Sequence, residues 1–165
     1  MRRVIVLASF SGRELARSLA IAAPLAVTLA LYWLFFEYPG DVDYFAATGG
    51  FTLSMAALVT TLLLANQFNR SSGYVILGRL HRRSELLVAI VVCAVTVAGL
   101  MAVLYSALVL GMRKVEITPG EVLLIAPRWL GLALFAATVT LHLTRLVSRG
   151  LSYLAALGVL ALVAT

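Results

Sequence analysis

Few side chains in this 165-residue sequence could take part in catalysis, and their spacing does not bring them together. General acid–base chemistry needs a His or carboxyl group within hydrogen-bonding reach of the reacting atoms. The seven acidic residues all fall at the ends of long apolar blocks or between them: Glu14, Glu37, Asp41, Asp43, Glu85, Glu116 and Glu121. Ser and Thr residues inside the blocks have no base nearby, so we expect their hydroxyls to bond to backbone carbonyls. We therefore expect a protein that is not itself an enzyme.

The residue types of a cofactor or nucleotide site are also missing. Cys93 is the only cysteine, which excludes a multi-cysteine metal site and favours a packing role within its apolar block. His81 and His142 could hold a haem only from facing helices, but one lies between apolar blocks and the other near the end of one. The sequence contains no phosphate-binding loop of the GxxxxGK type. We expect no cofactor, no metal and no ATP hydrolysis by this chain alone.

One charged residue, Arg128, lies within an apolar block, in the run Pro127-Arg128-Trp129. A charge within a membrane span is a candidate for function by default. Near the membrane surface, however, an Arg can extend its side chain to the interface and a Trp can anchor the helix there. Two interpretations therefore remain open for Arg128. It is an interfacial anchor, or it pairs internally or contacts a substrate, with Glu37, Asp41 or Asp43 as possible partners.

The apolar blocks that must position these residues are long enough to cross a membrane. Apolar residues make up 62% of the sequence and charged residues only 12%, against about 25% charged in a typical globular chain. We expect an all-α, polytopic integral membrane helix bundle, with residues 1–165 as a single transmembrane domain. The expected spans are residues 18–38, 45–66, 85–112, 121–143 and 150–165.

Local signals suggest where several of these helices begin. Residues 1–17 read as a cytoplasmic interfacial segment, in which Ser11-Gly12-Arg13-Glu14 matches a capping box and predicts a helix start near Gly12. Thr118-Pro119-Gly120-Glu121 is the clearest cap in the sequence. Within the first span, Pro24 is expected to kink the helix. An aromatic cluster suited to the head-group level closes this span: Tyr32, Trp33, Phe35, Phe36 and Tyr38.

Small residues recur every fourth position in two of the spans. Ala46, Gly50 and Ser54 share one face of the second span. The third span carries a similar stripe, made of Ala94, Ala98, Ala102 and Ser106. Because small residues let helices approach closely in lipid, we expect Gly50, Ser54, Ala98 and Ala102 to pack these two spans together.

Basic residues divide unevenly between the two sides of the expected bundle. Ten fall in the N-terminal segment and the second and fourth loops: Arg2, Arg3, Arg13, Arg17, Arg70, Arg79, Arg82, Arg83, Arg145 and Arg149. Only Arg113, Lys114 and Arg128 fall toward the other side. Since cytoplasmic loops carry the excess of Lys and Arg, the N-terminus is expected in the cytoplasm of a multi-pass plasma-membrane protein. The net charge of +6 thus indicates topology and contact with anionic lipids, and we expect no nucleic-acid partner.

The loop at 66–84 is the most informative segment, and we expect a cytoplasmic helix there. Its residues Tyr74 and Leu77 are spaced along one helical side, while Arg70, Arg79, Arg82 and Arg83 supply positive charge. One interpretation is an amphipathic helix that rests on lipid phosphates of the inner leaflet. The other is a docking helix for a cytoplasmic partner, with Arg70, Tyr74, Arg79, Arg82 and Arg83 as its contacts.

This loop resembles that of the permease subunit of ABC-2 type transporters. The similarity lies in the basic, Gly-containing start at Arg70-Ser71-Ser72-Gly73 and in the Leu80-His81-Arg82-Arg83-Ser84-Glu85-Leu86-Leu87 run that opens the third span. The resemblance implies an N-terminal interfacial helix and a coupling helix that contacts a separate ATP-binding cassette subunit. It also implies a dimeric exporter of a solute or lipid. The alternative is a non-catalytic accessory or assembly subunit of a larger membrane complex.

Overall fold

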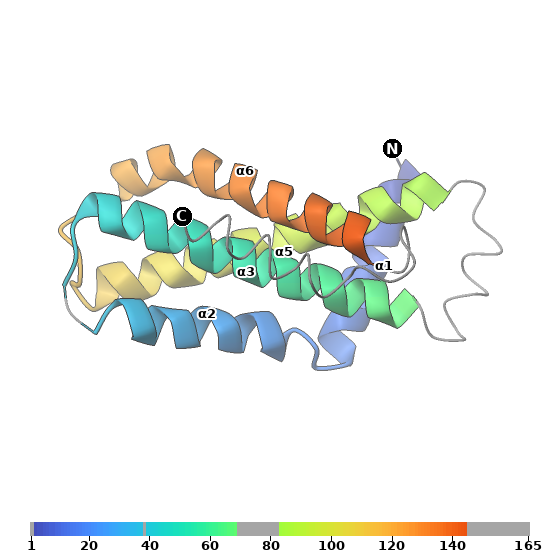
Figure 1. The fold of residues 1–165 in the computed structure, drawn as a ribbon, viewed down its shortest axis with the longest axis horizontal. Helices are drawn as coiled ribbons and strands as arrows, with labels where there is room; N and C mark the ends of the chain where they lie inside the picture. Colours follow the sequence, from blue (N-terminus) through green and yellow to red (C-terminus); the bar gives the residue numbers. More distant parts are fainter. Residues whose placement is uncertain (1, 38, 69–82, 145–165) are drawn as a thin grey trace.

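The computed structural model describes residues 2–37, 39–68 and 83–144, and every regular element in these ranges is a helix (Figure 1). The helices are α1 (Arg2–Arg17), α2 (Ala22–Phe35), α3 (Val42–Phe68), α5 (Arg83–Gly111) and α6 (Pro119–Leu143). The all-α prediction is confirmed for this part of the chain. The expected fifth span at 150–165 and most of the expected loop helix at 66–84 lie outside the described residues.

Three of the helices are long and apolar enough to cross a bilayer. Their apolar stretches are Val42–Gln67, Ser84–Gly111 and Pro119–Leu143, of 26, 28 and 25 residues. At about 1.5 Å per residue even the shortest is about 37 Å long, more than the roughly 30 Å of a hydrocarbon core. They correspond to the expected second, third and fourth spans.

The expected helix start near Gly12 is wrong. Helix α1 runs without a break from Arg2 to Arg17, and the Ser11 hydroxyl donates to the carbonyl of Leu7 at 2.9 Å instead of capping a new helix. When the upstream residues are helical, a Ser hydroxyl can donate to the carbonyl four residues earlier. The apolar side chains at positions 4, 7, 8 and 15 share the face of α1 that packs on α5, and this packing stabilises the helix upstream of Ser11.

A sharp elbow opens the expected first span at 18–38 and separates it from α1. Residues 18–21 form a turn, and the axes of α1 and α2 differ by 74° across it. The bend expected at Pro24 is not inside a continuous helix: α2 begins at Ala22, so the missing N–H of Pro24 falls in its first turn, and the 74° bend lies just before it at residues 18–21. With 14 residues, α2 is about 21 Å long, too short to cross a bilayer unaided.

Helix α3 is the centre of the bundle and contacts α2, α5 and α6 (Figure 1). Of its most apolar stretch, 67% is buried, compared with 44% for α5 and 22% for α6. This explains why α3 can carry several polar residues, since their hydroxyls face other helices. The hydroxyls of Ser54, Thr60 and Thr61 each donate to the carbonyl four residues earlier, as expected from the sequence.

A cluster of aromatic rings fills one half of the core. Tyr105 stands at its centre, with the ring of Phe45 stacked on it at 5.8 Å and the ring of Trp129 edge-on at 6.2 Å. Tyr32 and Phe36 also pack against Tyr105 and are only 4% and 3% exposed. Of the aromatic cluster predicted at the end of the first span, Tyr32 and Phe36 therefore face the core of the bundle, whereas Trp33 is 70% exposed. Offset and edge-on ring pairs stabilise each other beyond the area they bury.

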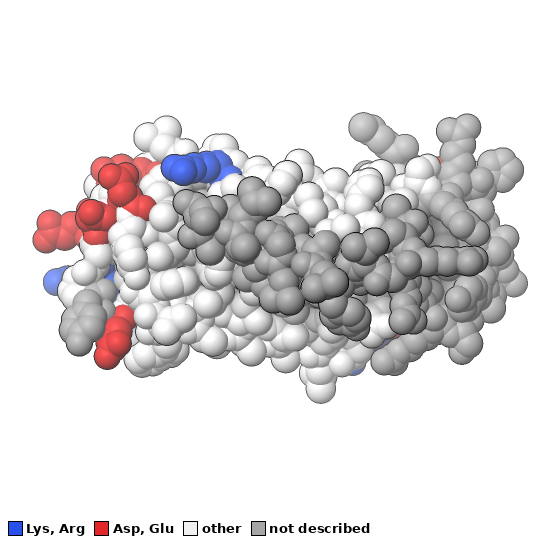
Figure 2. Space-filling view, in the orientation of Figure 1, with Lys and Arg blue, Asp and Glu red and all other residues white. Residues whose placement is uncertain are grey.

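The two ends of the bundle differ in charge, and we name them by their composition. The acidic end holds the connections α2–α3 and α5–α6, where five exposed acids gather: Glu37, Asp41, Asp43, Glu116 and Glu121 (Figure 2). The elbow end holds α1, the turn at 18–21 and the ends of α3, α5 and α6. At the acidic end the predicted cap of α6 is confirmed, because Thr118 and Glu121 each accept from the other's backbone N–H.

Candidate functional site

The structure describes almost none of the expected docking residues. Arg70, Tyr74, Arg79 and Arg82 lie outside the described residues. Arg83 is the first residue of α5, and its side chain also lies outside them. The surface that the structure does describe at the elbow end is formed by α1, the turn at 18–21 and the last turns of α3.

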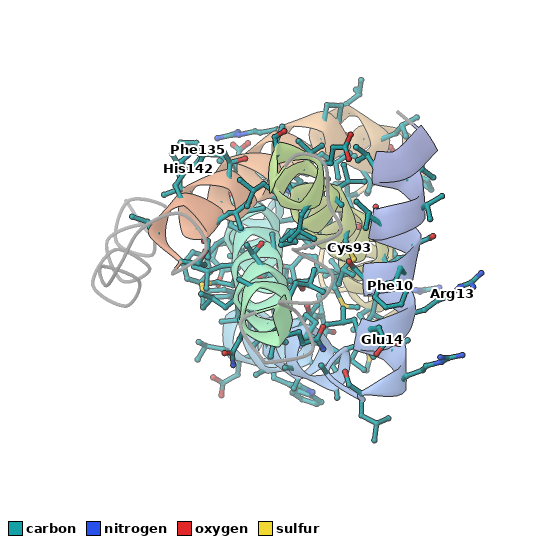
Figure 3. All side chains as sticks on the ribbon, turned by 90° about the vertical axis from the view of Figure 1, so that its right-hand side faces the viewer. Phe10, Arg13, Glu14, Cys93, Phe135 and His142 are labelled. Atoms are coloured by element: carbon teal, nitrogen blue, oxygen red, sulfur yellow. The ribbon has the colours of Figure 1, made fainter. Side chains whose placement is uncertain are left out.

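Helix α1 lies across α5 (Figure 3). The crossing is marked by Gly12, where an added Cβ would lie 3.8 Å from the Sγ of Cys93. Cys93 precedes the end of α5 at Gly111 by about 27 Å, close to the roughly 30 Å of a hydrocarbon core. If the acidic end marks one surface of the bilayer, α1 therefore lies at the opposite surface.

The two sides of α1 are chemically different. Ser11 and Leu15 are buried against the bundle at 1% and 0% exposure. The opposite side exposes Phe10, Arg13 and Arg17, and Arg13 projects away from the bundle in Figure 3. Arg17 lies 3.9 Å from Glu14, but both are well exposed, so this ion pair contributes little to stability. An amphipathic helix of this kind suits a head-group surface, with apolar contacts on one side and arginines for phosphates on the other.

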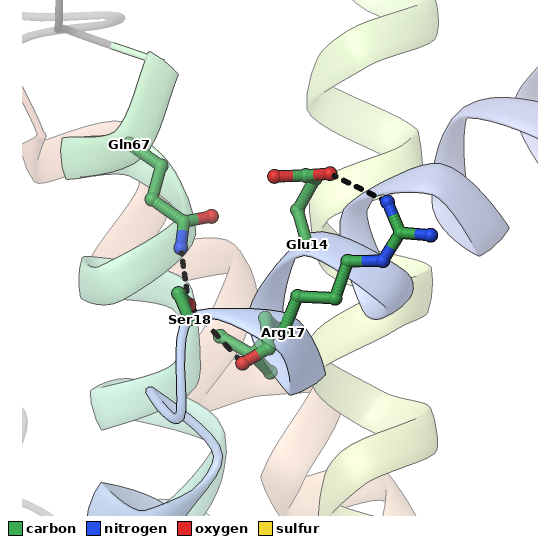
Figure 4. Close-up of polar contacts among 5 residues, drawn as sticks. Glu14, Arg17, Ser18 and Gln67 are labelled. Atoms are coloured by element: carbon green, nitrogen blue, oxygen red, sulfur yellow. Dashed lines mark hydrogen bonds and ion pairs between the residues drawn. The ribbon is translucent and has the colours of Figure 1, made fainter.

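The elbow between α1 and α2 is held by a specific contact (Figure 4). Leu19 has a φ of 55°, a left-handed conformation that is uncommon for a residue other than glycine, and its side chain is 76% exposed. Next to it, the side-chain amide of Gln67 in α3 donates to the Ser18 hydroxyl at 3.2 Å. The hydroxyl in turn donates to the Leu15 carbonyl at 3.2 Å. The elbow is thereby tied to the end of the central helix.

The small residues of α3 face a different helix from the one expected. A Cβ on Gly49 would lie 2.3 Å from Trp129, and a Cβ on Gly50 would lie 2.9 Å from Leu132, so this face receives α6 rather than α5. Ser54 continues the buried face at 3% exposure. On α5, Ala98 is buried where three helices meet, in a cluster with Ala57, Ala94, Ala133 and Ala137. Ala102 is half-buried against the main core.

Arg128 and Trp129 point in opposite directions. Trp129 is 1% exposed and its indole N–H donates to the Ala46 carbonyl at 2.8 Å, so the interpretation of this Trp as an interfacial anchor is wrong. Arg128 is exposed on the outward side of α6. It forms no ion pair with Glu37, Asp41 or Asp43, all of which the structure describes. The partner of Arg128 is therefore not one of the acids proposed from the sequence.

Comparison with known proteins identified no relative, because no family model, no curated protein and no solved structure matches the chain. Any functional conclusion therefore depends on the residues and their geometry.

The sequence analysis missed Ser18 and Gln67 at the elbow end, and it did not place Phe10 on one continuous helix with Arg13 and Arg17. A signal for Phe10 was present, because it shares a helical side with Arg3, Arg13 and Arg17 when residues 2–17 are read as one helix. The false capping box at Ser11 concealed this pattern. Nothing in the sequence linked Ser18 to Gln67, since they are 49 residues apart and meet only through the fold.

Proposed function

We propose that this chain is the membrane-spanning permease subunit of an ABC-2 type exporter. In this role it couples ATP hydrolysis by a separate ATP-binding cassette subunit to the translocation of a solute or lipid, as part of a dimer. Among the described residues, the observation that carries the proposal is α1, an amphipathic helix bent 74° from α2 that crosses α5 about one bilayer thickness from the acidic end. The order of interfacial helix, span and span, followed by a basic loop, is the order that the sequence resemblance implies.

The proposed orientation puts the elbow end in the cytoplasm of a plasma-membrane protein. Five basic residues belong to α1 and the start of α5 at the elbow end, namely Arg2, Arg3, Arg13, Arg17 and Arg83, against Arg113, Lys114 and Arg128 toward the acidic end. Phe68 and Arg83, which flank residues 69–82, are the last residue of α3 and the first of α5, and both belong to the elbow end. The loop between them therefore starts and finishes on the proposed cytoplasmic side. In this arrangement residues 18–38, which include α2, form the first of five spans and residues 150–165 form the last.

Coupling through the elbow end has a physical basis. A bundle of apolar helices has no phosphate-binding loop, so force must arrive from a soluble subunit. The loop joins directly onto α3, which contacts α2, α5 and α6. A displacement of the loop by a docked ATPase would therefore reach the most buried helix of the bundle, and the Gln67–Ser18 contact would pass it to α1.

Purification of the full-length chain from its own membranes in a mild detergent tests this function. The test variant reverses the charge of Arg79, Arg82 and Arg83 by substitution with Glu. The matched control reverses Arg113 and Lys114 at the acidic end in the same way. We expect a protein with an ATP-binding cassette to copurify with the native chain and the control, and to be lost from the test variant.

Two outcomes would overturn the proposal. In one, an ATPase copurifies equally with the native chain and the test variant, so that the loop is not its docking site. In the other, only membrane proteins copurify and no ATPase is found with the native chain. The second outcome would identify the chain as an accessory subunit of a membrane complex.

A further inference from the structure

Arg128 is a cation within an apolar helix that has no anionic side chain to pair with in its own chain. All seven acidic residues of the sequence lie in the described ranges, and none forms an ion pair with Arg128. A charged side chain within a membrane is costly unless a partner compensates it. Among the described residues Arg128 thus has no compensating anion, and a lipid or another subunit is the source that we consider.

The position of Arg128 along α6 favours a lipid phosphate. Glu121, an exposed acid in the first turn of α6, sets the upper limit of the hydrocarbon region, and Arg128 lies about 10 Å farther along the helix axis. An extended Arg side chain reaches about 6–7 Å, enough to return its guanidinium close to the boundary. Helical Cα–Cβ bonds tilt toward the helix N-terminus, which is at the acidic end in α6, so the side chain starts in the required direction.

The same face of α6 offers room for an acyl chain below the guanidinium. At Gly131, one turn deeper than Arg128, no described atom lies within 4 Å of the position that a Cβ would take. Phe135, seven residues after Arg128 and on nearly the same face, is 52% exposed. Figure 3 shows Phe135 and His142 together on the outward side of the helix. A lipid with its phosphate at Arg128 would therefore lay its chain along an apolar surface that leads toward the bilayer centre.

Glu121, which lies nearer the acidic end than Arg128, could distinguish one lipid head group from another. Glu121 is seven residues earlier and so lies on nearly the same face of α6. Figure 2 shows basic atoms over α6 next to the acidic atoms of that end. From the membrane outward the order of charge is positive and then negative. In a zwitterionic aminophospholipid the phosphate is the deeper group and the ammonium the outer one, which is the complementary order.

We propose that the exposed face of α6 binds an aminophospholipid of the phosphatidylethanolamine type, in the leaflet at the acidic end. The guanidinium of Arg128 binds the phosphate, and the ammonium donates to the free carboxylate oxygen of Glu121. The other oxygen, Oε2, accepts from Thr118, so the α6 cap is retained. This inference is independent of the proposed transport function, because it concerns a site in the leaflet away from the elbow end.

Native mass spectrometry of the full-length chain in detergent, titrated with phosphatidylethanolamine or phosphatidylglycerol, tests the site. The native chain is expected to bind the ethanolamine lipid more tightly. Arg128→Gln should weaken its binding about tenfold, the usual value of charge-assisted hydrogen bonds, and Arg128→Lys less, because the cation remains. Glu121→Gln keeps the capping box but should remove the preference for ethanolamine over glycerol. Arg113→Gln, a loss of charge in the loop beyond the span, is the matched control and should change neither affinity.

Several results would overturn the inference. The site is refuted if Arg128→Gln, with unchanged far-ultraviolet circular dichroism, binds the ethanolamine lipid as tightly as the native chain. The head-group assignment is refuted if phosphatidylglycerol binds the native chain equally well, or if Glu121→Gln leaves the preference intact. If Arg128→Gln instead releases a copurifying membrane protein and leaves lipid affinity unchanged, the partner of Arg128 is a carboxylate of another subunit.

Discussion

The contact between α3 and α6 predicts that Gly49 cannot be replaced even by alanine. An added Cβ would lie 2.3, 2.7 and 3.1 Å from three atoms of the Trp129 ring, all of them closer than an ordinary van der Waals contact. The indole cannot move aside freely, because its N–H is bonded to the Ala46 carbonyl at 2.8 Å and its ring packs on Phe45 at 5.0 Å. Gly49→Ala must therefore separate the helices or break this hydrogen bond.

The size of the effect follows from opposing contributions. Overpacking of a well-filled core costs about 1–3 kcal/mol. Loss of the indole hydrogen bond adds roughly 0.6–1.5 kcal/mol. Replacing a helical glycine by alanine returns about 1 kcal/mol through helix propensity. We expect Gly49→Ala to lower the free energy of unfolding by about 2 kcal/mol, whereas Gly131→Ala, with open space around it, should leave it unchanged or raise it slightly.

Unfolding of the purified chain by titration of a mild detergent with SDS measures this difference, with helix content followed by circular dichroism. In a Trp33→Phe background the remaining tryptophan is Trp129, and its emission should shift to longer wavelength in the Gly49 variant as the ring is displaced. A second substitution, Trp129→Phe, removes the ring atoms that clash. It should make Gly49→Ala less costly than it is in the native background, which a double-mutant cycle quantifies. Equal stabilities for Gly49→Ala and Gly131→Ala would refute the described packing of α3 on α6.

Two further predictions concern single hydrogen-bonding groups. Thr118→Ala removes the α6 cap and should lower the free energy of unfolding by about 1 kcal/mol in the same SDS titration. Ser11→Ala should cost well under half of that, because Ser11 lies inside α1. Equal losses would contradict the helix start at Arg2. Tyr105→Phe removes the hydroxyl that donates to Thr48 Oγ1 at 2.9 Å but keeps the ring at the centre of the aromatic cluster, so a loss of about 1 kcal/mol is expected. A loss as large as that of Tyr105→Ala would show that the hydroxyl, rather than the ring, organises the cluster.

The long apolar blocks made the central helices predictable from the sequence. Their periodicity and the capping box at Thr118 depend only on neighbouring residues, and the structure has α3, α5 and α6 close to the expected positions. The N-terminal half was harder because two local signals pointed the wrong way. Ser11 matched a cap that tertiary packing on α5 overrides, and Pro24 suggested a kink in a helix that begins only two residues earlier.

For the candidate site, the sequence predicted only which basic residues lie on the same side of the bundle. The count of basic residues in the sequence put Arg13 and Arg17 on the side opposite to Arg113, Lys114 and Arg128, and the structure has α1 at the elbow end. The neighbour of each small-residue stripe was not predictable. Gly50 and Ala98 carry the same signal, yet one faces α6 and the other a junction of three helices, and this choice depends on how all the helices pack together.

Cysteine labelling in intact cells tests the central claim most directly, namely that the elbow end and the acidic end lie on opposite sides of a membrane. In a Cys93→Ala background, single cysteines replace Glu116 at the acidic end and Arg13 on α1, both exposed positions. A membrane-impermeant maleimide should label the cysteine at position 116 in intact cells, and the one at position 13 only after the membrane is opened. Labelling of both positions before permeabilisation, or of position 13 alone, would contradict the account.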